Sequence, residues 1–259
     1  DLNLVLYAGH GDFPRIILAP GTLEEGYSLS RTAFSLADKY QVPVFILTDQ
    51  FFVDSKYNAS LSGIDFSEPR KHISETDAAY RRFQLTDTGI SRRGVPGYGT
   101  GNVCADSDEH DESGHITEDL AVRVQMTDKR NRKLESIRQD IIEPTLAGPR
   151  DYSTLVICWG STYSTVAEAV RCLGRGDVAV LHFAWLFPLA ETVNDYLAKA
   201  GRLIIVENNY SAQFADLIAL STGARIATRI RKYNGLPFSV EEVVAELEVC
   251  LRDGAHNGK

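Results

Sequence analysis

Short, continuous apolar runs alternate with segments of helical spacing, and this alternation constrains the fold more than any other feature of the 259-residue chain. In the second half, the apolar runs cover residues 154–159, 178–183, 202–207 and 224–230. Helical patterns follow them at residues 160–173, 190–200, 211–222 and 240–251. A run that is apolar at every position is typical of a strand covered on both faces, as in parallel sheets. The second half is therefore predicted to be a parallel α/β domain with helices on both faces of its sheet.

The first half begins with a similar unit. Apolar runs at 15–20 and 42–49 flank a helical pattern at 23–39, and strand–helix–strand with short connections predicts a βαβ unit. Thr22 precedes the helical pattern and is its expected N-cap. Asp49 closes the second run, so it is expected at the carboxyl edge of a sheet, where open α/β sheets bind their ligands. Capping the turn that follows is an equally good interpretation of Asp49.

A histidine between two glycines, His10 in Gly9-His10-Gly11, lies ahead of this unit. The glycines allow a tight turn, but the third glycine of a phosphate-binding loop is absent. His10 is therefore interpreted as a turn residue, with a cofactor ligand as the alternative.

An acidic stretch at residues 106–119 separates the two halves. It holds seven carboxylates, two histidines and no Lys or Arg. Residues 56–100 before it show little periodicity and are interpreted as a functional loop, a subunit arm or a connector. A helix is predicted after it, at 118–142, with Thr117 as its N-cap and an apolar stripe of Leu120, Val124, Leu134, Ile137 and Ile141. The acidic stretch is either a solvated connector or, if it is buried, a general acid/base group with a raised pKa beside a histidine.

Known metal-binding patterns do not fit this stretch. A calcium-binding loop starting at Asp106 would need Gly and Glu where Asp111 and Thr117 stand. His110 and His115 are five residues apart, which is not the spacing of a zinc-protease helix. The four cysteines form no CxxC pair, so neither an iron–sulfur cluster nor a zinc site is expected in this chain.

A second pattern, Gly176-Asp177 with Asn208-Asn209, is similar to the one that holds magnesium and thiamine diphosphate. The third glycine of that pattern is missing. Asp177 also precedes its predicted strand, whereas a metal-binding Asp is expected after a strand, at the carboxyl edge. We interpret the match as chance, and no metal site is predicted.

The composition excludes several classes of partner. The net charge is -8, and the basic residues that follow the acidic stretch are local and balanced by it, so no nucleic acid partner is expected. No apolar run approaches the length of a membrane span, so no membrane partner is expected either. The cysteines fit buried thiols in a reducing compartment, and a cytoplasmic location is predicted.

The chain also carries a series of longer matches to one known family. The matching segments are 7–15, 18–21, 42–50, 106–112, 114–119, 129–134, 159–162, 206–209 and 232–238. Together they resemble the α subunits of 2-oxoacid:ferredoxin oxidoreductases, and the 2-oxoglutarate type in particular. The matches follow the family's order along essentially the whole chain, and the acidic stretch is the most specific of them.

The resemblance implies a reaction, a fold and partners. The family decarboxylates a 2-oxoacid such as 2-oxoglutarate on thiamine diphosphate, transfers the acyl group to coenzyme A, and passes the electrons through an iron–sulfur cluster to ferredoxin. The implied α/β fold has the back half of a pyrimidine-side thiamine-binding-type domain at 1–100, the acidic loop and connecting helix at 101–149, and a transketolase-C-terminal-like parallel domain at 150–259. A β subunit is the expected partner, and it is expected to hold most contacts to thiamine diphosphate, magnesium and the [4Fe-4S] cluster. None of these is expected on this chain alone.

The chain departs from the family pattern at its front. The upstream part of the pyrimidine-side domain, with its Tyr-Pro-Ile-Thr-Pro-like segment and its substrate-carboxylate loop, has no counterpart. We therefore expect a C-terminal portion that needs the missing N-terminal part of the α subunit, leaves apolar edges of its first sheet uncovered, and is inactive alone.

The resemblance also suggests two roles for the acidic stretch. In the assembled enzyme it would bring His110, with Asp106 or Glu109, into an active site at a subunit interface. The alternative is a non-catalytic docking module, in which the acidic stretch and the basic helix behind it form a charge clamp.

Overall fold

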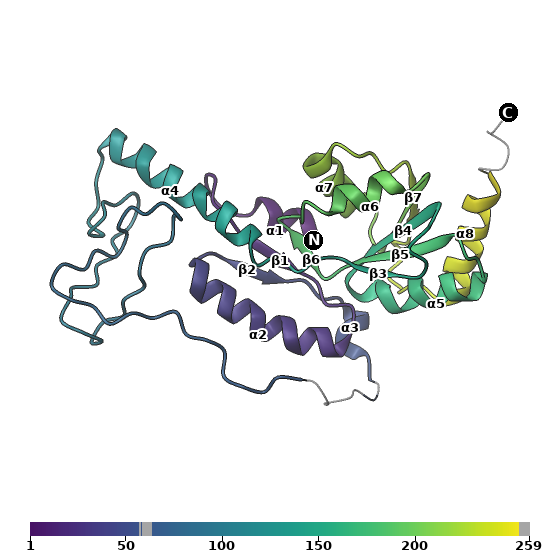
Figure 1. The fold of residues 1–259 in the computed structure, drawn as a ribbon, viewed down its shortest axis with the longest axis horizontal. Helices are drawn as coiled ribbons and strands as arrows, with labels where there is room; N and C mark the ends of the chain where they lie inside the picture. The colour runs from purple at the N-terminus through teal and green to yellow at the C-terminus, as the bar shows by residue number, and fades with distance from the viewer. Residues whose placement is uncertain (57, 59–63, 254–259) are drawn as a thin grey trace.

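The computed structural model describes residues 1–56, 58 and 64–253. Two sheets lie next to each other, and α4 with the loop before it extends away from them (Figure 1). The helices are α1 (Leu2–Tyr7), α2 (Leu23–Tyr40), α3 (Gln50–Asp54), α4 (Leu120–Arg138), α5 (Tyr163–Leu173), α6 (Val193–Lys199), α7 (Gln213–Thr222) and α8 (Val240–Asp253), with the short η1 (Gly160–Thr162) before α5. The strands are β1 (Ile16–Leu18), β2 (Val44–Ile46), β3 (Thr145–Ala147), β4 (Thr154–Trp159), β5 (Val178–Phe183), β6 (Trp185–Phe187), β7 (Arg202–Glu207) and β8 (Thr228–Arg231). Among the helices of the described residues, none is long and apolar enough to cross a membrane.

The larger sheet has the strand order β3-β5-β4-β7-β8. Its strands run parallel, except that β3 pairs antiparallel with β5 at the edge. Side chains of β4 alternate between the faces: Leu155 and Ile157 pack in one core with α6 and α7, whereas Val156 and Cys158 pack in the other with α5 and α8. β5 is buried along its whole length because helices cover both faces. The predicted parallel α/β domain is thus confirmed.

The smaller sheet, of order β2-β1-β6, joins the two halves of the sequence. β1 pairs parallel with β2, as the predicted βαβ unit requires, and antiparallel with β6 from the second half. The domain division at residues 149/150 stays a prediction. The pairing of β6 with β1 joins strands from the two sides of that division. β2 is a half-exposed edge strand, with Ile46 36% exposed. The expectation that this run is covered on both faces is therefore wrong for the described residues.

A polar contact ties α2 to the larger sheet. Thr22 caps α2 as predicted, accepting a hydrogen bond from the Glu25 N–H at 3.1 Å. The Glu25 carboxylate accepts from the Gly21 N–H at 2.7 Å and lies 3.2 Å from Nε2 of the buried His182 on β5. Burial would raise the pKa of Glu25, but the hydrogen bonds with His182 and Gly21 outweigh it and lower the pKa. A Cβ on Gly21 would lie 2.8 Å from the His182 ring, so only glycine fits between them.

The helix after the acidic stretch is shorter than predicted. α4 spans Leu120–Arg138 rather than 118–142. Its N-cap is Asp119, not Thr117, because the Asp119 carboxylate accepts hydrogen bonds of 2.7 and 3.3 Å from two backbone N–H groups of the first turn.

Only the C-terminal half of α4 packs on the sheets. Leu120 and Val124 of the predicted apolar stripe are 78% and 60% exposed, whereas Ile137 is fully buried against β1 and α2. Close to Ile137, the Tyr40 hydroxyl donates to the Asp140 carboxylate at 2.7 Å. Burial, together with this carboxylate, raises the pKa of Tyr40 to about 12. The exposed half of α4 therefore projects from the body of the protein (Figure 1).

Two lysines of α4 bind neighbouring backbone, one in the loop between α3 and α4 and the other in the turn after α2. In the loop between α3 and α4, the described residues 64–119 contain no helix or strand, only two isolated bridges, as the lack of periodicity predicts. Lys129 Nζ donates to the Phe83 carbonyl at 2.7 Å, and Lys133 Nζ donates to the Gln41 carbonyl at 3.1 Å. Burial lowers the pKa of both lysines to about 8. Each lysine therefore anchors a neighbouring backbone segment at the cost of placing an ammonium group out of water.

Candidate active-site loop

The acidic stretch folds into a compact hairpin-like turn. Residues 109–111 and 115–117 run antiparallel, joined by two backbone hydrogen bonds of 2.9 and 3.0 Å. At the tip, the Asp111 carboxylate accepts from three successive backbone N–H groups at 2.8, 3.0 and 3.1 Å. These N–H groups, that of His115 most of all, lower the pKa of Asp111. The tip is thus held by charge-assisted hydrogen bonds within the loop itself.

Most carboxylates of this loop are acceptors for protein N–H groups. The five engaged in this way are Asp106, Glu109, Asp111, Glu112 and Asp119. Glu112, for example, accepts from the Leu85 N–H at 2.8 Å and pairs with Arg81 at 3.2 Å, which fixes the tip to the preceding loop. These contacts order the loop, although Asp108 and Glu118 are exposed.

Glu109 is the most buried carboxylate of the loop. Its side chain is 7% exposed and forms two hydrogen bonds to the Arg130 guanidinium on α4, at 3.0 and 2.7 Å. The guanidinium holds the pKa of Glu109 below its usual range, in spite of burial. From the sequence, a raised pKa is expected for a carboxylate buried in this loop. That expectation is wrong for Glu109. Its carboxylate is ionised at neutral pH and cannot donate a proton.

His110 lies beside this ion pair with no hydrogen bond to its ring. Its imidazole packs edge-on against Phe83, with 3.7 Å between ring centroids. Nδ1 is 3.6 Å from the Glu109 carboxylate, which is beyond hydrogen-bond distance, and neither ring nitrogen has another partner within the described residues. Burial lowers the pKa of His110, which favours the neutral form of its imidazole. A buried, uncommitted imidazole is uncommon and can accept or donate a proton once a partner reaches it.

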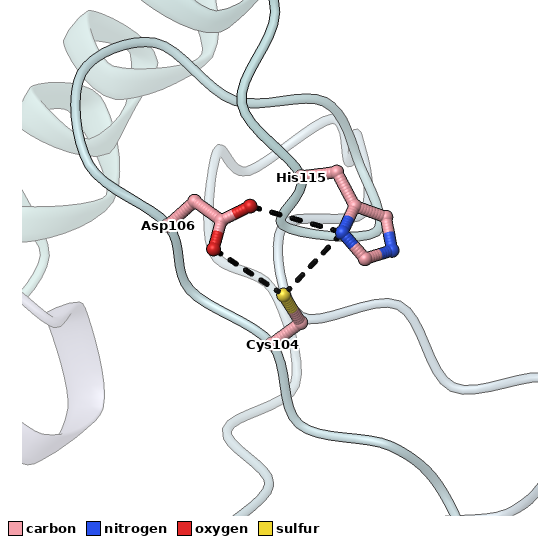
Figure 2. A group of neighbouring side chains, drawn as sticks. All are labelled: Cys104, Asp106 and His115. Carbon is pink, nitrogen blue, oxygen red and sulfur yellow. Dashed lines mark hydrogen bonds and ion pairs between the residues drawn. The ribbon is translucent and has the colours of Figure 1, made fainter.

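Asp106 and the second histidine form a separate group with a cysteine. Figure 2 shows Cys104, Asp106 and His115 directed toward one another. The Cys104 sulfur is 3.6 Å from Nδ1 of His115 and 4.0 Å from the Asp106 carboxylate, and that carboxylate is 3.8 Å from the same Nδ1. Partial burial, with Asp106 and Asp111 nearby, raises the pKa of the Cys104 thiol. The structure therefore separates Asp106 from the Glu109–His110 pair.

Asp49 and His10 lie away from the acidic loop. Asp49 follows β2 as predicted, caps α3 by accepting from the Phe52 N–H at 2.8 Å, and accepts a hydrogen bond from the Ser161 hydroxyl behind β4. A cavity of about 140 Å³ opens beside it, lined also by Trp159 and Asn208. α3, which Asp49 caps, and α4, whose Arg130 binds the neighbour of His110, lie well apart in Figure 1.

His10 lies in a turn between two glycines, as is expected from the sequence. His10 is exposed, and its neighbours Gly9 and Gly11 have φ values of +106° and +70°, which a glycine adopts without strain. Roles of His10 and Asp49 in cofactor binding stay predictions.

The residues similar to a thiamine diphosphate and magnesium site do not fit that role. Asp177 precedes β5, where Arg175 binds its carboxylate through two hydrogen bonds of 2.9 Å. Asn208 and Asn209 follow β7, and their amide groups donate to the Lys232 carbonyl and the Glu207 carboxylate. Because β5 and β7 are parallel, Asp177 and the two asparagines lie at opposite edges of the sheet, so this set cannot hold one metal ion.

A family model that matches the first half of the chain defines the class of protein. Residues 1–129 match the family described as pyruvate flavodoxin/ferredoxin oxidoreductase, thiamine diP-bdg. The first half of the chain is thus a domain of thiamine-diphosphate-dependent oxidoreductases, joined to a parallel α/β domain.

Longer matches narrow this class. The chain is 32% identical, over 98% of its length, to the α subunit of 2-oxoacid:ferredoxin oxidoreductase 1 from Sulfurisphaera tokodaii. It is 24% identical, over 95% of its length, to the 2-oxoglutarate synthase subunit KorA of Methanothermobacter marburgensis. Its fold is similar to the 2-oxoglutarate:ferredoxin oxidoreductase from Magnetococcus marinus, with a TM-score of 0.86 and 26% identity over 96% of this chain.

The chain belongs to the family of 2-oxoacid:ferredoxin oxidoreductase α subunits, which confirms the resemblance seen in the sequence. It spans 41% of the length of the Sulfurisphaera relative, 67% of the Methanothermobacter relative and 44% of the Magnetococcus chain.

The sequence does not single out two residues of this loop region, Arg130 and Cys104. Arg130 is one of several basic residues, and nothing in its local sequence distinguishes it from Arg132 as the partner of Glu109. Cys104 has no second cysteine near it. Its position two residues before Asp106 is the one sequence signal that could have placed it at the loop.

Proposed function

We propose that the complete protein carries out the thiamine-diphosphate-dependent oxidative decarboxylation of a 2-oxoacid such as 2-oxoglutarate. The carboxylate leaves as carbon dioxide, the acyl group passes to coenzyme A, and the electron pair released in the oxidation passes through a [4Fe-4S] cluster to ferredoxin. A β subunit supplies most contacts to thiamine diphosphate, magnesium and the cluster, and this chain is inactive without that partner and the rest of the α subunit. The reaction takes place in the cytoplasm.

The observation that carries this proposal is the similarity to the Magnetococcus enzyme along 96% of the chain. That enzyme's structure contains 2-oxoglutarate, coenzyme A and succinyl-CoA. The match to 2-oxoglutarate synthase subunits favours 2-oxoglutarate over other 2-oxoacids as the substrate.

Within this reaction, we assign the acidic loop to an active site at the subunit interface. His110 is the proposed acid/base group, because neither nitrogen of its buried ring has a hydrogen-bond partner in the described chain. Glu109 cannot act as an acid, since Arg130 keeps it ionised. Its contribution is to hold the backbone of His110, whose N–H donates to the Glu109 carboxylate at 3.2 Å. Asp106, whose side chain is 44% exposed, lies apart from His110 beside Cys104 and His115, so a catalytic role for it is the weaker part of this assignment.

The test replaces His110 in the assembled complex of complete subunits. His110→Gln keeps a polar side chain of similar size but cannot exchange a proton near neutral pH, and His110→Ala removes the ring. Both are expected to lower the rate of 2-oxoacid-dependent ferredoxin reduction by about 100-fold or more, in line with the loss of a general acid/base. The pH profile of kcat/KM is expected to lose one ionisation in both variants. Size-exclusion chromatography checks that the complex still assembles.

Unchanged turnover in both variants would remove His110 from the mechanism. The charge-clamp alternative is favoured by one specific observation, the Glu109–Arg130 ion pair between the loop and α4. If the loop serves only docking, assembly of the complex should weaken steeply between low and high salt, and His110→Gln should leave turnover of the assembled complex intact.

A further inference from the structure

We propose that Cys104, Asp106 and His115 form a zinc-binding site at the base of the acidic loop. Each residue supplies one atom of a type that zinc prefers: a thiolate sulfur, a carboxylate oxygen and an imidazole nitrogen. The site does not depend on the proposed oxidoreductase reaction, because it is argued only from this chain's own side chains.

The distances among the three side chains are close to those that zinc imposes. With bonds of about 2.3 Å to sulfur and about 2.0–2.2 Å to nitrogen and oxygen, a tetrahedral ion separates its ligand atoms by about 3.4–3.6 Å. The corresponding distances here are 3.6 Å from the Cys104 sulfur to Nδ1 of His115, 3.8 Å from that Nδ1 to Asp106, and 4.0 Å from the sulfur to Asp106. The Cys104 sulfur and the His115 nitrogen face different oxygens of Asp106. When a single oxygen of Asp106 is chosen, it lies, like the other two donor atoms, within 4.8 Å of both partners. A small rotation of the carboxylate completes one face of a tetrahedron.

The backbone holds the three ligands in this arrangement. The Asp106 N–H donates to the Gly114 carbonyl at 2.9 Å, and the Asp106 carboxylate accepts from the Ile116 N–H at 3.1 Å. The second of these hydrogen bonds orients the carboxylate, as partners of metal-bound carboxylates commonly do. Gly114 has φ +97°, and a Cβ there would lie 2.1 Å from the Cys104 carbonyl oxygen, so the two chain segments meet through a glycine. In Figure 2 the second ring nitrogen of His115 points away from the other two ligands.

Charge and donor type both favour a zinc ion over calcium or magnesium. Residues 106–119 contain seven carboxylates and no Lys or Arg, so the loop attracts cations. Calcium and magnesium take oxygen ligands, whereas a thiolate with an imidazole suits zinc. On binding, the zinc–sulfur bond replaces the sulfur–hydrogen bond of Cys104, and the proton is released to solvent. Three protein ligands leave a fourth position open to water.

Zinc at this site would close a twelve-residue loop from Cys104 to His115. That loop includes Glu109 and His110, which pack against α4 and Phe83 on its other side. The bound ion therefore fixes the base of the segment that carries them, in place of the weak thiol contact of 3.4 Å to the Gly114 carbonyl.

The test measures zinc in the complex of complete subunits. After incubation with one equivalent of zinc chloride per α subunit and removal of free ion, elemental mass spectrometry is expected to find about one zinc per α subunit. Cys104→Ser, Asp106→Asn and His115→Asn are each expected to weaken zinc binding by more than about tenfold, because loss of a ligand exceeds the effect of losing a hydrogen bond to one. The matched control is Cys172→Ser: Cys172 also lies 3.8 Å from a carboxylate, that of Glu168, but it belongs to no Cys/His/Asp group of the described chain. This control is expected to retain the zinc.

A second measurement needs no variant. X-ray absorption at the zinc edge, which does not detect iron, is expected to show one sulfur at about 2.3 Å and lighter atoms at about 2.0–2.2 Å. A shell of oxygen atoms only, or zinc retained equally in all three ligand variants, would overturn the proposal. Wild-type protein that holds no zinc would overturn it as well. Loss of ferredoxin reduction has no bearing on any of these outcomes, so failure of the zinc site and failure of the proposed reaction are distinguishable.

Discussion

Replacing Arg130 is expected to destabilise the acidic loop more than replacing Glu109, although both changes break the same ion pair. The Glu109 side chain is 7% exposed, whereas that of Arg130 is 34% exposed. In Arg130→Met, a buried carboxylate loses its partner and cannot regain full hydration. In Glu109→Gln, the guanidinium left behind can turn to water, and the glutamine keeps a hydrogen-bond acceptor.

The magnitudes follow from this asymmetry. Removing one partner of a buried pair costs about 3–5 kcal/mol, and partial exposure of the guanidinium reduces this to about 2–3 kcal/mol for Arg130→Met. Glu109→Gln is expected to cost about 1 kcal/mol. With a double variant that costs about 1–2 kcal/mol, the coupling energy between the two residues is about 1–3 kcal/mol.

Hydrogen exchange of the amides at residues 106–119, in the complex of complete subunits, measures these costs as local opening. A loss of 2 kcal/mol corresponds to an exchange rate about 30 times faster. The effect should depend on pH in a defined direction. Because the pKa of Glu109 is lowered in the folded protein, the pair stabilises the loop above the ordinary glutamate pKa of 4.5, and this contribution is lost as the pH falls through the lowered pKa.

The matched control is the pair Glu168–Arg171 on α5, which also has two hydrogen bonds but is exposed on both sides. Its disruption is expected to leave exchange of the acidic loop unchanged. The reasoning is refuted if Arg130→Met costs no more than Glu109→Gln, or if the two changes are additive.

Three further outcomes follow from other parts of the fold. Ile137→Ala empties a fully buried site between α4 and the smaller sheet and is expected to lower the free energy of unfolding by about 2–5 kcal/mol, measured by urea unfolding. The control is Val124→Ala at an exposed position of the same helix. A loss for Ile137→Ala no greater than that of the control contradicts this packing. Lys129 has a pKa of about 8 against an ordinary 10.5, so its burial penalty, up to about 3 kcal/mol, is present below pH 8 and is relieved as the pH rises toward 10.5. Stability measured between pH 8 and 10 should rise less in Lys129→Met than in the wild type, and an equal rise would contradict the role of this lysine. Gly114→Ala should speed amide exchange at Cys104 and His115, because a Cβ there meets the Cys104 carbonyl, whereas Gly176→Ala, which meets nothing within 4 Å, should not.

Many elements of this fold follow from short stretches of sequence. β4, β5 and β7 coincide with their predicted apolar runs to the residue, and α2 begins after the predicted cap Thr22. Such features depend on neighbours within a few positions, because alternation, helical spacing and capping are local properties of the chain. β2 shows the limit of this reasoning, because its continuous apolar run indicates a strand but not which layers cover it.

The acidic stretch shows which part of a site the sequence cannot supply. Its composition and order identify the family and mark the loop as the candidate site. It does not show that Glu109 is bound by Arg130, 21 positions away. This contact lowers the pKa of Glu109, which burial alone would raise. Nor does the stretch itself show that the two histidines separate, His110 packing on Phe83 and His115 meeting Cys104.

The sequence by itself thus determined the alternating α/β architecture, the family and the loop on which to look for chemistry. Only the tertiary structure decided that β6 completes the smaller sheet, that half of α4 is exposed, and which side chain pairs with which. The physical reason is one of range. Secondary structure is specified by neighbours within a few residues, whereas ion pairs, burial and metal-ligand groups depend on which distant segments the folded chain brings within a few ångströms.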